Sequence, residues 1–117
     1  MKLYIPTCTL NFNNIFTTES ISPASHYSNR GFGNKRYFKV EANDLDNVVM
    51  LYSKYPLFKI NDGDMENSPM VIEIESDDYF KEQFVKVGEK DGIESYASNT
   101  SIYLNPFHCL IYFQSYQ

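Results

Sequence analysis

Residues 70–75 constrain the fold more than any other stretch, because their last side chains alternate between apolar and acidic. Side chains that alternate in this way point to opposite faces of a β-strand. Ile72 and Ile74 should therefore face a core. Glu73 and Glu75 should face solvent, and replacing Glu73 with alanine should barely change stability. The stretch predicts a sheet with one buried face.

Other short apolar runs predict further strands. Residues 48–52 are apolar throughout, which is typical of a strand buried on both faces. Pro6 suggests that the first strand lies at a sheet edge or bends early. The predicted strands cover residues 2–10, 35–42, 48–52, 70–75, 85–87, 93–96, 102–104 and 109–113. The last four should form two hairpins, with connections at residues 88–92 and 105–107.

Capping residues predict two or three short helices. An asparagine at position 11 or 13 can cap a turn over residues 12–16. Ser22 and Pro23 are a typical N-cap and first helical residue, and they predict a second helix that ends near residue 29. Ser76 and Asp77 predict a third helix that ends near residue 83.

Length and composition predict one α+β domain. A chain of 117 residues is long enough for a core of its own. Ten tyrosines, nine phenylalanines and no tryptophan favour sheet. We therefore expect a mostly antiparallel sheet of short strands with two or three short helices.

Charge is unevenly distributed along the chain, whose formal net charge is −5. Residues 1–40 contain five cationic side chains and one acidic one, whereas residues 41–117 contain five and fourteen. Duplex nucleic acid is an unexpected partner for such an acidic chain, because its affinity for proteins comes mainly from cations. The sequence has no long apolar stretch, so we expect a cytoplasmic protein without a membrane partner.

The segment that begins at Asn11 and ends at Arg36 is the candidate binding segment. After its two predicted helical turns, a glycine pair permits a sharp turn and close backbone approach. The candidate ligand- or partner-binding residues are His26, Tyr27, Arg30, Gly31, Gly33, Lys35 and Arg36. The sequence favours a non-catalytic binding or scaffolding domain that recognises a protein partner or a small anionic ligand through residues 11–36.

No complete catalytic or metal-binding pattern is present. Cys8, His26, His108 and Cys109 lack the spacing of zinc ligands, so no metal is expected. The cysteines are expected to be reduced, buried thiols. No cofactor is predicted from the residues.

The closing apolar run, residues 110–113, lacks charge that would discourage strand pairing. It predicts either a homo-oligomer that pairs through Leu110 to Phe113, or a longer polypeptide whose next segment packs there.

The order of elements resembles that of small ADP-ribosyltransferase-like domains, such as the DarT and RNA 2′-phosphotransferase groups. The resemblance lies in residues 14–16, residues 20–23 and residues 69–74, which read NIF, SISP and PMVIEI. It implies an NAD-using transferase or a degenerate form of one. No motif chooses between Glu73 and Glu75 as the family glutamate, so neither is assigned a catalytic role. The family histidine is replaced by residues 4–7, YIPT.

The opening also looks like the start of larger uncharacterised bacterial proteins associated with phage defence. The stretches that carry this likeness read KLYIP, LNFNNI, ESISPASHY and RGFG, within the first forty residues. It implies that the single domain, residues 1–117, is the N-terminal module of a longer chain.

Overall fold

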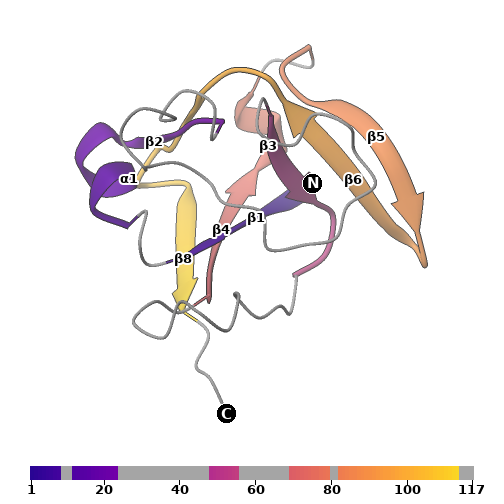
Figure 1. Cartoon of the computed structure of the whole chain (residues 1–117), viewed down its shortest axis with the longest axis horizontal. Helices are drawn as coiled ribbons and strands as arrows, with labels where there is room; N and C mark the ends of the chain where they lie inside the picture. Colours follow the sequence, from indigo (N-terminus) through magenta and orange to yellow (C-terminus); the bar gives the residue numbers. More distant parts are fainter. Residues whose placement is uncertain (9–11, 24–47, 56–68, 80–81, 114–117) are drawn as a thin grey trace.

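The computed structural model of the whole chain describes residues 1–8, 12–23, 48–55, 69–79 and 82–113. These residues contain one α-helix, α1 (Phe12–Thr18), and one 3-10 helix, η4 (Ser76–Asp78) (Figure 1). The strands, in chain order, are β1 (Lys2–Cys8), β2 (Ser20–Ile21), β3 (Val49–Tyr52), β4 (Pro69–Glu75), β5 (Val85–Lys90), β6 (Ile93–Ser98), β7 (Ile102–Tyr103) and β8 (Cys109–Phe113).

Six strands form one antiparallel sheet in the order β5-β6-β3-β1-β4-β8, and β2 pairs with β7 in a separate two-stranded sheet. Strands β5 and β8 lie at opposite sides of the molecule in Figure 1. The predicted mostly antiparallel sheet is confirmed, but the described residues contain less helix than the two or three short helices predicted, with one α-helix and a single 3-10 turn.

The core forms on one face of the central strands. Leu3 pairs with Ile74 and Ile5 pairs with Ile72, so the alternating apolar residues of β1 and β4 share that face. All four side chains are buried, as predicted for Ile72 and Ile74. Strand β3 is buried along its whole length, which confirms the expectation for an apolar run without polar positions.

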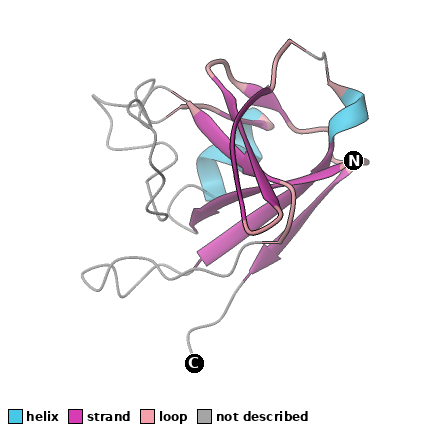
Figure 2. Cartoon of the chain, turned by 90° about the vertical axis from the view of Figure 1, so that its right-hand side faces the viewer, coloured by secondary structure: helices cyan, strands magenta, loops and turns pink. Residues whose placement is uncertain are grey.

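Helix α1 contributes to the same core. Ile15 is buried in the main apolar cluster, and Phe12 packs against it. Figure 2 shows the two helical segments at separate places beside the strands, with one close to the N-terminus. That one is η4, because the Ser76 amide donates to the Met1 carbonyl.

Strand β1 is not an edge strand, so one option suggested by Pro6 is wrong. The strand lies between β3 and β4, and Pro6 is opposite Val71 of β4. Toward β3 the described pairing is Tyr4 with Tyr52. A proline is compatible with an interior strand where the ladder on one side does not need its missing N–H.

The first predicted hairpin is confirmed, with longer strands and a tighter turn than expected. Strands β5 and β6 meet at Asp91 and Gly92, whose φ angles are 55° and 80°. Positive φ at both central positions is the signature of a type I′ turn, whose twist suits a two-residue hairpin. Gly88 lies in β5 beside a register shift, not in the turn.

The second predicted hairpin is wrong. Strand β7 pairs with β2, whereas β8 pairs with β4, where Ile111 is opposite Ile72. The chain therefore changes sheets between β7 and β8. Short apolar runs report which face of a strand is buried, but they do not report which distant strand is its partner.

The helix predicted after Ser76 is also shorter than expected. Only η4 forms, and Tyr79 is already extended, with φ −122° and ψ 158°. Its ring lies 5.1 Å from that of Phe84, and its hydroxyl donates to the Tyr103 carbonyl at 2.5 Å. These tertiary contacts compete with continuation of the helix. The helix predicted from Pro23 to residue 29 and the strand predicted at residues 35–42 lie outside the described residues.

Candidate functional site

Strand β8 is an edge of the large sheet. Strand β4 pairs with one side of it, and no other strand among the described residues pairs with the opposite side. The strand, CLIYF, contains no charged residue. Leu110 is 54% exposed and Phe113 59% exposed, with Tyr112 also on the surface. The edge therefore presents apolar side chains beside backbone groups that can pair with another strand.

Helix α1 extends this edge with aromatic side chains. The Phe12 ring lies 5.7 Å from that of Phe113 and 5.9 Å from that of Phe16, on which it stacks. Phe16 is 72% exposed. The backbone places Ile15 in the core and Phe16 outside it, as expected for neighbours on a helix. We call Phe12, Phe16 and Phe113 the aromatic surface.

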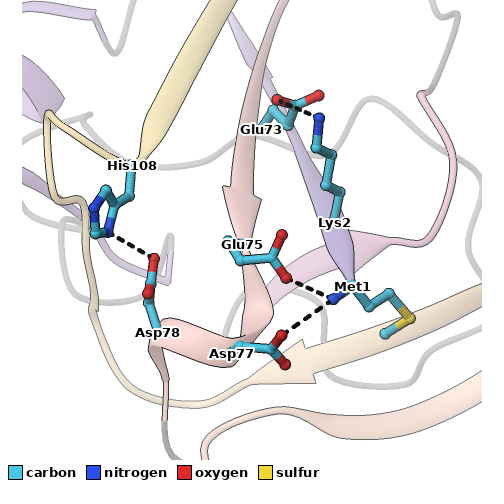
Figure 3. Close-up of polar contacts among 7 residues, drawn as sticks. All are labelled: Met1, Lys2, Glu73, Glu75, Asp77, Asp78 and His108. Atoms are coloured by element: carbon cyan, nitrogen blue, oxygen red, sulfur yellow. Dashed lines mark hydrogen bonds and ion pairs between the residues drawn. The ribbon is translucent and has the colours of Figure 1, made fainter.

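Strand β4, the neighbour of β8, carries a buried carboxylate on the face of the sheet that points away from the core. Glu73 is only 8% exposed, which corrects the prediction that it faces solvent. It does point away from the Ile72 face, but its cross-strand neighbours are Tyr4 and Leu110, which help to cover it. Glu73 Oε2 lies 3.8 Å from Lys2 Nζ (Figure 3), and Oε1 lies 3.5 Å from the Tyr112 hydroxyl.

Tyr4 and Tyr112 contact that carboxylate, and a third tyrosine ring packs against both of them. The Tyr55 ring lies edge to face with those of Tyr4 and Tyr112, at centroid distances of 5.7 Å and 5.4 Å. Burial raises the pKa of Tyr4, and a hydrogen bond to Glu73 raises it further. We call Lys2, Tyr4, Tyr55, Glu73 and Tyr112 the tyrosine–carboxylate cluster.

Three further polar contacts involve η4 or the residue just before it (Figure 3). The Met1 amino group lies 2.5 Å from Glu75 Oε1 and 3.7 Å from Asp77 Oδ2, and its hydrogen bond lowers the pKa of Glu75. His108 Nδ1 lies 3.1 Å from Asp78 Oδ2. All of these side chains are exposed to a large extent, so the contacts tie η4 to its neighbours without enclosing a site.

The other edge strand, β5, is built differently. Lys86 Nζ lies 3.3 Å from both Glu89 Oε2 and Glu94 Oε1. Tyr96 donates to the second oxygen of Glu94 at 2.6 Å. These hydrogen bonds, first that from Tyr96 and then that from Lys86, lower the pKa of Glu94. Charge and the register shift beside Gly88 both discourage pairing at this edge.

Every residue predicted to bind a ligand or partner lies in a part of the chain that the structure does not describe. These residues are His26, Tyr27, Arg30, Gly31, Gly33, Lys35 and Arg36. Of residues 11–36, the structure describes 12–23, with α1 and β2. Cys109 is a half-buried free thiol whose pKa is raised by burial. The described residues contain no group of His, Cys, Asp or Glu side chains placed to hold a metal ion.

Sequence reasoning missed the tyrosine–carboxylate cluster. Its members are far apart in sequence, and only the pairing of β1 with β4 and of β4 with β8 brings them together. One signal was available: Lys2 and Tyr4 alternate on the first strand as Glu73 and Glu75 do on β4. Matching these alternations required the register of the two strands.

No family model, no curated protein and no solved structure matches this chain. A function for this chain is therefore inferred from its own residues. Neither helix among the described residues is long and apolar enough to cross a membrane.

Proposed function

We propose that this domain binds a protein partner, and that an extended segment of the partner adds to the sheet as a strand beside β8. The aromatic surface would contact the same partner from the side of α1. Phe12 and Phe16 belong to the binding segment predicted from the sequence, residues 11–36.

The observation that carries the proposal is the uncharged, apolar outer strand. Leu110, Tyr112 and Phe113 are exposed on β8. Strands in natural proteins are usually protected at a sheet edge by charge, by proline or by a bulge. A strand that lacks such protection is the ordinary receptor for β-strand addition, in which backbone hydrogen bonds supply affinity and side chains supply specificity.

A pair of matched lysine variants tests the proposal. Phe113 on β8 and Val85 on β5 are 59% and 60% exposed, so a lysine at either position can reach solvent, and Phe113→Lys in addition loses the contact with the Phe12 ring. A library of displayed peptides is first selected on the unaltered domain. We expect Phe113→Lys to weaken the affinity for the selected peptides by about tenfold or more, as for an interface anchor, and Val85→Lys to leave that affinity unchanged.

The measurement is fluorescence polarisation with the selected peptides, after circular dichroism has shown that both variants are folded. Failure to select any peptide, or equal loss in the two variants, would contradict binding at β8. Light scattering over a range of concentrations separates a self-associating domain from a monomer that binds another protein.

An NAD-using transferase is the second candidate, and one observation favours it. Glu73, one of the two glutamates that the ADP-ribosyltransferase resemblance leaves open, is buried beside tyrosine rings. NAD or ADP-ribose should then raise the melting temperature of the domain, and Glu73→Gln should abolish NAD turnover. Absence of any thermal shift at millimolar ligand would remove this alternative.

A further inference from the structure

The tyrosine–carboxylate cluster contains a carboxylate, Glu73, whose one cationic partner among the described residues, Lys2, lies at a long distance. Glu73 is almost fully buried, and burial of a carboxylate is costly unless close donors surround it. Tyr4 donates a hydrogen bond to it, but its contact with the cation of Lys2 is 3.8 Å long and its contact with the Tyr112 hydroxyl is 3.5 Å long. Ordinary charge-assisted hydrogen bonds are about 2.7–2.9 Å long. A better-placed cationic donor would therefore improve the surroundings of this carboxylate.

The rings of the cluster suit the same cation. Tyr55 is 38% exposed and Tyr112 36% exposed, and their rings are close to perpendicular, with an interplanar angle of 86°. A perpendicular pair presents a ring face and a ring edge to one region of space. Ammonium and guanidinium groups are attracted to tyrosine faces within about 6 Å. Carboxylate and rings together select a cation over a neutral polar group.

The cluster lies next to the edge where the proposed partner would bind. Glu73 is directly opposite Leu110 of β8. A strand added outside β8 would place its residue opposite Leu110 about 10 Å from Glu73, which is two strand spacings. Tyr112 points to the same face of β8 as Leu110 because side chains two apart share a face. A lysine or arginine on the added strand, at that position, has a stem long enough to reach across β8.

Net charge favours the same partner. The chain carries a formal charge of −5, and nearly all of its acidic residues follow residue 40. Opposite charge on a partner accelerates association and helps to set the register of binding. A second copy of this chain fits less well, because its own β8 has no cation to offer.

We propose that the partner segment at β8 is a basic strand, in which one lysine or arginine delivers its cation to Glu73 among Tyr4, Tyr55 and Tyr112. This inference rests on the proposed function for the strand, although the cation site itself can be measured alone. Lys2 occupies part of the site in the free domain, so the incoming cation competes with it.

The first experiment measures the cation site without a peptide. n-Butylguanidinium is titrated into the isotopically labelled domain, with neutral n-butylurea as the matched probe, and backbone amide shifts are followed by NMR. We expect saturable shifts at Glu73, Leu110 and Tyr112 with the cation only. Glu73→Gln should weaken the binding about tenfold or more, whereas Lys2→Ala should strengthen it several-fold by removing the internal competitor.

Equal shifts with n-butylurea, or no shift with either probe, would overturn the cation site. Lys2→Ala keeps the test decisive if Glu73→Gln fails to fold, because unchanged or weaker cation binding in Lys2→Ala also overturns it. Phe113→Lys serves as a control, since it alters the edge without touching Glu73.

The second experiment tests whether a peptide bound at β8 also places its cation at Glu73. Peptides selected on the domain are resynthesised with citrulline in place of arginine, or with norleucine in place of lysine, one residue at a time. One replacement should weaken binding to the unaltered domain about tenfold and have little effect in Glu73→Gln.

The two proposals can fail separately. Selected peptides that need Phe113 but tolerate every replacement would sink the basic-strand inference and leave the proposed function standing. Binding of n-butylguanidinium without any peptide preference for β8 over β5 would leave the cation site and remove the proposed function. A domain whose only ligand at β8 is a second copy of itself, seen by light scattering, would also overturn the basic strand.

Discussion

Strands β5 and β8 close the same sheet at opposite edges, and their side chains differ in kind (Figure 1). Strand β5 carries Lys86, Glu89 and Lys90, and Lys86 lies between two carboxylates, those of Glu89 and Glu94. Strand β8 carries no charge and is flanked by phenylalanines from α1. Because an exposed edge without charge favours pairing with another strand, this difference is the basis of the proposal that a partner binds at β8 and not at β5.

The strands next to the two edge strands, β6 and β4, also differ in their polar side chains. Next to β5, the polar side chains of Glu94 and Tyr96 remain partly exposed and satisfy each other at 2.6 Å. Next to β8, Glu73 is buried with long contacts to Lys2 and Tyr112. The β5 edge thus has a short hydrogen bond from Tyr96 to Glu94 and exposed ion pairs at 3.3 Å, whereas the carboxylate next to β8 has its cationic partner, Lys2, at 3.8 Å.

The largest effect is expected in the centre of the sheet, where both edges depend on the same core. Ile72→Ala removes a fully buried side chain from β4 and should reduce the free energy of unfolding by about 2–5 kcal/mol. The exposed Val87→Ala on β5 should change it by less than about 0.5 kcal/mol. Urea unfolding measures both free energies. Similar losses in the two variants would mean that Ile72 of β4 does not belong to the core on which the sheet depends.

The next effect concerns the carboxylate behind β8. Glu73→Ala should reduce the free energy of unfolding by about 1–3 kcal/mol, because it leaves the half-buried Tyr4 hydroxyl without its acceptor. Glu89→Ala on the exposed β5 edge is the matched control and should produce no measurable change. A neutral Glu73→Ala in the same urea series would restore the solvent-facing assignment made from the sequence.

Removing charge from β5 should make the two edges alike. Lys86→Val would place three valines in a row on that strand, at residues 85–87. We expect this variant to self-associate at lower protein concentration than the unaltered domain, because the edge loses the charge that discourages pairing. Light scattering measures the onset. An identical concentration dependence in both proteins would show that the ion pairs of β5 do not protect it.

The smallest effect is a pH dependence at the β5 edge. The folded-state pKa of Glu94 is lowered by the Tyr96 hydroxyl and then by Lys86. The stabilisation of the fold by ionised Glu94 is therefore complete above the ordinary pKa of 4.5, and it is lost as the pH falls through the lowered pKa of the folded state. Lys86→Met should reduce the drop in melting temperature between neutral and acidic pH. Parallel pH profiles for the two proteins would refute a role for this pair.

The strands that could be predicted are those whose pattern is complete within a few residues. Alternation in residues 70–75 placed Ile72 and Ile74 in the core, and the apolar run of residues 48–52 indicated burial on both faces. The β5–β6 hairpin was also predictable, because Asp91 and Gly92 are typical of a two-residue turn. The helix after Ser76 was not, because Tyr79 forms tertiary contacts in place of another helical turn.

By itself, the sequence determined the class of the fold, the main strands, and the face of β4 that enters the core, since these depend on side-chain periodicity and turn chemistry. It also determined that residues 110–113 carry no charge. Only the tertiary structure decided that β8 pairs with β4 at the edge of the sheet and that Glu73 is buried beside Lys2, Tyr4 and Tyr112. The physical reason is that periodicity is a local property, whereas strand partners and register come from contacts between residues far apart in the chain.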